Sequence, residues 1–149
     1  MTHVVGVIQA RVGSARLPGK ALMDVSGKPL LQHVIERMQA CRRMERVILA
    51  TTAEPGDRPL LALAQRLAIE AFAGSVNDVL DRTYQAASRA GAGVVVRITG
   101  DDPLKDPGVT DRVIADLLDS GADYSSNTLV PTFPEGVDIE VCTYAALAR

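Results

Sequence analysis

The sequence predicts an α/β fold, a mostly parallel sheet with helices on both faces. Short apolar segments rich in β-branched residues alternate along the chain with segments whose apolar residues recur at helical spacing. The helical segments are about ten or more residues long, as a crossover between parallel strands requires. The 149 residues suffice for one domain with a single hydrophobic core, and no linker divides them.

The first half of the chain predicts three strands and two helices. Apolar, β-branched runs predict strands at residues 4–8, 46–52 and 69–74. Residues 29–38 place leucine, valine, isoleucine and methionine side chains on one face, which predicts a helix. Residues 54–67 predict a turn followed by a helix, for which Asp57 is the expected N-cap.

The second half contains the clearest strand, within VVVRITGDDP (94–103). Residues 75–91 predict a helix that ends at a glycine, with Val79, Leu80, Tyr84 and Ala87 facing the core. A further helix is predicted from about residue 107 to residue 119. Weaker patterns predict strands at residues 122–127 and 136–141 and the start of a helix at residues 143–149.

Charge and composition argue against several classes of function. The net charge is −2, from 16 basic and 18 acidic residues, so no overall field draws the chain to nucleic acid or to an anionic membrane. Aromatic residues make up 3% and tryptophan is absent, which argues against a base-stacking platform. Two cysteines and two histidines form no zinc or disulfide pattern. Because the sequence contains no secretory or membrane-spanning segment, we expect a soluble, cytoplasmic protein.

The most distinctive segment is the loop IQARVGSARLPGKAL (8–22), which interleaves Arg11, Arg16 and Lys20 with small residues. It is not a Walker A loop, because five residues separate its glycines and alanine follows the lysine, and it has no G-x-G-x-x-G pattern. Small residues expose backbone N–H groups, and basic side chains can close around a phosphate. We therefore predict an anion site rather than a solvated turn, at the carboxyl ends of the strands where such sheets bind ligands.

Six segments resemble, in order, those of the cytidylyltransferase family: QARVGSARLPGKAL, GKPLLQHVIER, VILATT, VNDVLDRTYQAA, VVVRITGDDPLKDP and PEGVDIEV. That family includes the acylneuraminate and 3-deoxy-manno-octulosonate cytidylyltransferases. The likeness is closest to its SpsF-type spore coat polysaccharide branch, often called glycosyltransferases. The resemblance implies a Rossmann-like nucleotide-diphospho-sugar transferase fold. It also implies transfer of CMP from CTP to a sugar or sugar acid for surface polysaccharide biosynthesis, with Mg²⁺ as cofactor and release of pyrophosphate.

The resemblance also implies which residues bind the nucleotide. The opening loop would hold the triphosphate, and the loops after residues 74 and 98 would complete the site. The implied nucleotide-binding residues are Gln9, Ala10, Arg11, Gly13, Ser14, Arg16, Lys20, Gly74, Ser75, Asp81, Arg82, Thr99 and Gly100. The implied catalytic residues are Arg11, Lys20 and Asp101. For the second loop, helix capping by Ser75 or Asn77 and a solvent-exposed Asp81–Arg82 face are the alternatives.

Two pairs of carboxylates follow predicted strands or lie on them. The resemblance implies that Asp101 holds Mg²⁺ against phosphate oxygens, whereas GDDP is also an ordinary turn sequence. Because Asp101 and Asp102 are adjacent, they should point in different directions, and we expect only one to be a ligand. Asp138 and Glu140 are two apart on a predicted strand and so share a face. The resemblance favours sugar binding by that face, and the alternative is plain solvent exposure.

The chain also departs from the family pattern. Family members are usually longer, so we expect residues 1–149 to form one nucleotide-binding domain without the C-terminal part of the family fold. The resemblance places a second metal-binding aspartate and part of a dimer interface in that part. The expected partners are CTP and a sugar or sugar acid, and a homodimer is left open. Two alternatives for the function remain: a glycosyltransferase that uses a nucleotide-sugar donor, and an inactive nucleotide-binding or regulatory module.

Overall fold

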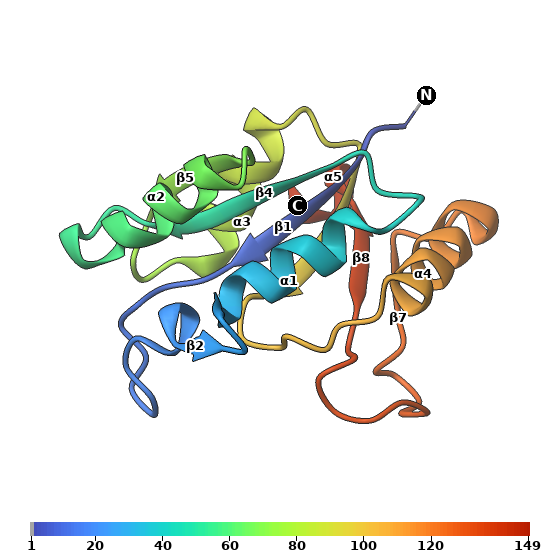
Figure 1. The fold of residues 1–149 in the computed structure, drawn as a ribbon. Helices are drawn as coiled ribbons and strands as arrows, with labels where there is room; N and C mark the ends of the chain where they lie inside the picture. Colours follow the sequence, from blue (N-terminus) through green and yellow to red (C-terminus); the bar gives the residue numbers. More distant parts are fainter. Residues whose placement is uncertain (1) are drawn as a thin grey trace.

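A six-stranded sheet in the order β5-β4-β1-β6-β8-β7 forms the centre of the computed structural model, which describes residues 2–149 (Figure 1). The strands are β1 (Val4–Gln9), β4 (Arg46–Thr52), β5 (Glu70–Gly74), β6 (Val94–Thr99), β7 (Tyr124–Ser126) and β8 (Glu140–Thr143). Strands β5, β4, β1 and β6 are parallel, and β8 runs antiparallel to both β6 and β7. The sheet is therefore mostly parallel, which confirms the predicted fold class. A small hairpin of β2 (Asp24–Val25) and β3 (Lys28–Pro29) was not predicted.

Helices cover both faces of the sheet, as predicted (Figure 1). On one face lie α1 (Leu30–Gln39), α2 (Arg58–Arg66) and α4 (Pro107–Ser120), and on the other lie α3 (Val79–Arg89) and α5 (Tyr144–Leu147). Successive residues of β6 divide between the two cores, with Val96 and Ile98 in the first and Val95 in the second. Because strand side chains alternate, Arg97 shares the face of α3 and α5. Within residues 2–149 no helix is both long and apolar enough to cross a membrane.

The strand order reverses between β1 and β6. From β1 the chain runs to β4 and β5 on one side of the sheet and then crosses to β6 on the other side. In open α/β sheets the crevice outside the carboxyl ends of the strands at such a reversal is the usual ligand site. The loops that follow Gln9 and Thr99 therefore face a common crevice.

The predicted strand at residues 136–141 is wrong over most of its length, because β8 begins only at Glu140. The preceding residues form a turn in which the amide of Val137 donates to the carbonyl oxygen of Pro134. The side chain of Asn127 fastens this turn: it donates to the carbonyl oxygen of Val137 at 3.0 Å and accepts from the amide of Ile139 at 2.8 Å. Asp138 consequently does not share a strand face with Glu140.

Two expectations about helices are also wrong. Asp57 precedes α2, but its side chain makes no capping hydrogen bond there; it is used elsewhere, as described below. Helix α3 begins only at Val79, so Val79 and Leu80 lie in its first turn and are exposed. The residues of α3 that face the sheet are smaller, with Ala86 and Ala87 fully buried.

The close approach of β1 and β6 depends on Gly100, since a Cβ atom there would lie 2.7 Å from the carbonyl oxygen of Gln9 and 2.9 Å from the Cβ of Ala10. We predict that Gly100→Ala lowers the free energy of unfolding by about 1–3 kcal/mol, because backbone must move to relieve the overlap. Urea denaturation measures the change. Gly13→Ala is the control, because a Cβ there meets nothing within 4 Å. Equal effects of the two substitutions would contradict this account.

Candidate active site

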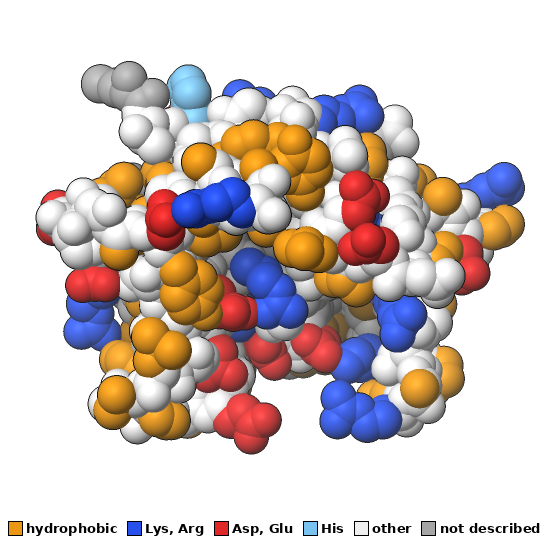
Figure 2. Space-filling model, turned by 180° about the vertical axis from the view of Figure 1, so that it is seen from behind, with side chains coloured by type: hydrophobic (Ala, Val, Ile, Leu, Met, Phe, Trp, Pro, Cys, Tyr) orange, Lys and Arg blue, Asp and Glu red, His pale blue; other side chains and the backbone are white. Residues whose placement is uncertain are grey.

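A cavity of about 580 Å³ opens where β1 and β6 end. Among the residues inferred from the sequence, those that line it are Gln9, Ala10, Arg11, Ser14, Arg16, Lys20, Arg82, Thr99, Gly100 and Asp101. Those that do not line it are Gly13, Gly74, Ser75, Asp81, Asp138 and Glu140. From behind, the molecule shows a hollow open at its lower edge, with basic side chains gathered on one side and acidic ones on the other (Figure 2).

The loop after β1 is shaped by hydrogen bonds to Val12. The carbonyl oxygen of Val12 accepts from the amides of Ser14 and Gly19, both at 2.9 Å, so the loop folds back on itself. Gly19 has a φ of 74°, which glycine adopts without the steric cost that other residues incur. Lys20 follows directly and begins a short 3₁₀ turn. This folding brings the three basic side chains of the loop to the wall of one cavity.

Arg82 is the most constrained cation in the cavity, with only 3% of its surface exposed. One guanidinium nitrogen donates to the carbonyl oxygen of Ser75 at 2.6 Å, but Nε makes no hydrogen bond among the described residues. Burial, with a further contribution from the nearby Arg11, lowers the pKa of Arg82. A buried charge with few partners is costly, and an anion in the cavity would offset the charge of Arg82. The alternative of an exposed Asp81–Arg82 face is therefore wrong for Arg82, whereas Asp81 is exposed.

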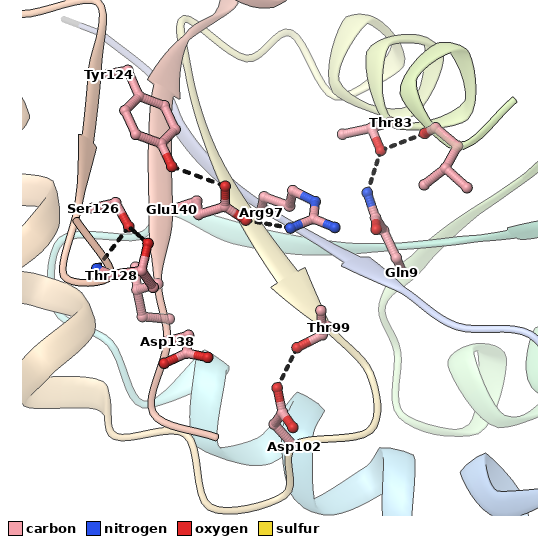
Figure 3. A network of polar contacts seen from close by, with 12 residues as sticks. Gln9, Thr83, Arg97, Thr99, Asp102, Tyr124, Ser126, Thr128, Asp138 and Glu140 are labelled. Atoms are coloured by element: carbon pink, nitrogen blue, oxygen red, sulfur yellow. Dashed lines mark hydrogen bonds and ion pairs between the residues drawn. The ribbon is translucent and has the colours of Figure 1, made fainter. Parts of the chain in front are cut away.

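The loops after β1 and β6 are joined by an ion pair between Lys20 and Asp101. The hydrogen bond from Lys20 lowers the pKa of Asp101, so this carboxyl group is ionised at neutral pH. Asp102 points elsewhere: it accepts from the hydroxyl of Thr99 at 2.5 Å (Figure 3) and lies 3.2 Å from the ammonium group of the buried Lys105. The two adjacent acids do point in different directions, and Asp101 is the one that lines the cavity.

The residues around Asp101 fit Mg²⁺ only together with a phosphate. Within the part of the chain that the structure describes, no three Asp, Glu, His or Cys side chains converge to hold a metal ion. Mg²⁺ in nucleotide sites commonly uses one or two carboxylates and completes its shell with phosphate oxygens and water. Asp101 supplies one ionised carboxylate beside the cationic loop. The donor set therefore fits a cation that arrives with a polyphosphate.

A second polar cluster lies on the same sheet face, beside the first cavity (Figure 3). Arg97 of β6 forms an ion pair with Glu140 of β8, and the hydroxyl of Tyr124 donates to the other oxygen of Glu140 at 2.9 Å. All three side chains line a second, largely apolar cavity of about 520 Å³. Arg97 lines both cavities, so the two adjoin at this side chain. Asp138 is exposed and lines neither cavity, and its carbonyl oxygen accepts from the ammonium group of Lys105.

The sequence analysis missed Arg97. It is the one charged residue in β6, a strand otherwise made of valine, isoleucine and threonine. A charged side chain that interrupts a buried strand two residues before its end is a signal that it lies at the ligand edge of the sheet. Read together with strand alternation, this signal would have placed Arg97 on the same face as Thr99.

Comparison with known proteins agrees with this geometry. Residues 5–138 match the family model described as cytidylyltransferase. The chain belongs to the cytidylyltransferase family. It is 39% identical over 127 residues to the 3-deoxy-manno-octulosonate cytidylyltransferase of Geobacter sulfurreducens. This match covers 80% of this chain and 47% of that protein. It is 32% identical over 145 residues to the spore coat polysaccharide biosynthesis protein SpsF of Bacillus subtilis. This match covers 95% of this chain and 59% of that protein.

A solved structure of this family supports the fold over nearly the whole chain. The cytidylyltransferase of Leptospira borgpetersenii matches with a TM-score of 0.94 and 33% identity, covering 99% of this chain and 63% of that one. The resemblance inferred from the motifs is thereby confirmed at the level of family and fold. The chain spans about half to three fifths of the length of the curated relatives it matches.

We predict that inorganic pyrophosphate stabilises the chain and that Arg82→Met removes most of this effect, because pyrophosphate then loses the buried cation of the cavity. At a hundred times its dissociation constant, a ligand raises the free energy of unfolding by about 2.7 kcal/mol. Thermal unfolding with and without pyrophosphate measures the difference. Arg89→Met is the matched control, since Arg89 is exposed at the other end of α3. Full stabilisation of the Arg82→Met variant would argue against an anion site at this position.

Proposed function

We propose that this protein transfers CMP from CTP to a sugar or sugar acid and releases pyrophosphate. One observation carries the proposal: a buried arginine that pairs with no carboxylate within residues 2–149 lies in a cavity with three more cations from the loop after β1, at the reversal of the strand order. Membership of the cytidylyltransferase family supports CTP as the nucleotide. The relative named as a 3-deoxy-manno-octulosonate cytidylyltransferase supports a sugar acid as acceptor, and SpsF supports a role in surface polysaccharide biosynthesis.

In the proposed reaction, the oxygen of a sugar hydroxyl bonds to the α-phosphorus as the bond from that phosphorus to the α–β bridging oxygen breaks. Pyrophosphate leaves with the electron pair, and the hydroxyl proton passes to solvent. Lys20 and Arg11 stabilise the charge that develops on the α-phosphate and the leaving group, while Arg16 and Arg82 hold the other phosphates. Cations already fixed around the triphosphate need little rearrangement during the reaction, which lowers its barrier.

Asp101 is the residue proposed to hold Mg²⁺ beside the phosphates. When bound, the ion supplies positive charge against the phosphate oxygens. Before binding, Asp101 is paired with Lys20, so each of these side chains neutralises the other. With Asp101 holding the cation, Lys20 would be free to face a phosphate oxygen.

The acceptor is proposed to bind beside Arg97, Glu140 and Tyr124. This cluster adjoins the nucleotide cavity and presents both hydrogen-bond donors and acceptors, which suits a ligand with many hydroxyl groups. Glu140 lines the second cavity and Asp138 does not, so Glu140 is favoured among the two carboxylates inferred from the sequence.

We expect CTP with Mg²⁺ to raise the unfolding temperature more than UTP, GTP or ATP, because the site is proposed to select cytosine. Asp101→Asn should abolish pyrophosphate release from CTP and a sugar acid, because the carboxylate that holds the cation is lost, while CTP still binds without metal. Thermal unfolding and a pyrophosphate assay measure these effects.

Other outcomes would replace the proposal. Stabilisation by a nucleotide sugar without pyrophosphate chemistry would identify a glycosyltransferase. CTP binding with no turnover on any sugar acid would identify an inactive nucleotide-binding module. No stabilisation by any nucleotide would contradict a triphosphate site in this cavity.

Arg97→Gln and Glu140→Gln should raise the KM for the acceptor about tenfold, the cost of one charged hydrogen bond, and leave the KM for CTP nearly unchanged. Steady-state kinetics with each substrate varied in turn separates the two constants. Arg46→Gln is the matched control, because Arg46 forms a comparable exposed ion pair with Glu70 between β4 and β5, away from both cavities. If the KM for CTP rises instead, Arg97 contacts the nucleotide and not the acceptor.

A further inference from the structure

Asp57 is a buried carboxylate that the sequence analysis treated only as a helix cap. It ends a short 3₁₀ turn (Pro55–Asp57) just before α2, and 3% of its surface is exposed. It does not line the candidate nucleotide cavity. A buried aspartate that neither caps its helix nor contacts the cavity needs another explanation, since burial of a carboxylate is costly unless its oxygens are satisfied.

The carboxylate of Asp57 bonds both to its own neighbourhood, at the end of β4, and to the loop after β1, 45 residues away in the sequence. One oxygen accepts from the amide of Val12 at 2.7 Å. The other accepts from the hydroxyl of Thr51 at 3.1 Å, from the amide of Thr52 at 3.2 Å, and from the hydroxyl of Thr52. The carboxylate therefore ties the loop after β1 to the end of β4 and to the start of α2.

Backbone hydrogen bonds of Val12 hold that loop in its folded shape. Its amide donates to Asp57, and its carbonyl oxygen accepts from Ser14 and Gly19, which closes the loop. Fixing Val12 therefore fixes both ends of the turn that carries the basic side chains. Because cations must stand at defined distances from a polyphosphate to be effective, a small displacement of the turn weakens binding.

The charge of Asp57 acts on the same site. Burial raises the pKa of Asp57, but its hydrogen bonds, above all those from Thr52 and Val12, outweigh burial and lower the pKa. Asp57 is thus ionised at neutral pH. Its negative charge favours the protonated form of Arg82, in opposition to the effect of burial and of Arg11. Since both its oxygens face protein donors, the charge offsets the cations without occupying the space of a phosphate.

We infer that Asp57 is a positioning residue of the phosphate-binding loop, which sets triphosphate affinity through Val12 without touching the nucleotide. The inference rests on the proposed function for the identity of the ligand. The arrangement of the loop itself can be tested without any nucleotide.

The test is Asp57→Asn, which keeps the shape of the side chain and removes its charge. Hydrogen exchange of the Val12 amide in the ligand-free protein should become faster, and the dissociation constant for CTP should rise about tenfold. At saturating CTP, kcat should change less than KM, because Asp57 contacts no reacting atom. A merely structural residue would lower the unfolding temperature without this split between KM and kcat.

Asp111→Asn is the matched control. Asp111 of α4 also accepts two backbone hydrogen bonds across the chain, from Arg42 at 3.0 Å and Arg43 at 2.9 Å, and lines neither cavity. If Asp57→Asn leaves Val12 exchange and CTP affinity as Asp111→Asn does, the inference is overturned. If the wild type binds no CTP, the proposed function fails, whereas faster Val12 exchange would still show that Asp57 holds the loop in place. If Asp57→Asn does not fold, Asp57→Glu replaces it, because it keeps the charge and moves the carboxylate. Val12 exchange and the dissociation constant for CTP in that variant then test the inference.

Discussion

The pairing of β1 with β6 is the constraint on which the candidate site depends. These parallel strands are in register from Val4 opposite Val94 to Gln9 opposite Thr99, so both end at the same level. Their loops can then share one cavity, and the missing side chain of Gly100 lets the two backbones approach. A slip of one residue would turn Gln9 to the other face of the sheet, because strand side chains alternate. The position of the site is thus fixed by the backbone before any charged side chain contributes.

Some of the basic side chains around the cavity pair with carboxylates and others do not, and the excess of positive charge favours the binding of a polyanion. Lys20 is neutralised by Asp101 and Arg97 by Glu140, whereas Arg82 has no carboxylate partner among the described residues. Asp57 supplies a negative charge below the loop and leaves the cavity itself cationic. The protein therefore tolerates an unfavourable concentration of positive charge that a triphosphate would relieve. A chain of net charge −2 thus has a local site of positive charge.

The sequence was sufficient to predict the parallel strands and the basic loop, because both are local patterns: apolar β-branched runs, and small residues among cations. It was insufficient where contacts between distant segments decide. Asp57 has the local pattern of a helix cap, but Val12 and Thr52 compete for its oxygens. The alternation in residues 136–141 resembles a strand, but the side chain of Asn127 holds most of it as a turn. Roles of single residues in the site, such as Lys20 and Asp101, stay predictions.

The Asn127 side chain has a consequence for how such proteins diversify. The Asn127 side chain bonds to the backbone on both sides of Asp138. These hydrogen bonds hold the two ends of the connection between β7 and β8 together. Loop closure at the base means that added or lost residues between the ends cost little conformational entropy and leave the sheet undisturbed. Because this connection is separate from the basic loop, its length and composition can change without altering the cavity at the ends of β1 and β6. If the proposed acceptor site lies beside this connection, new acceptor preferences could arise there without changes to the basic loop.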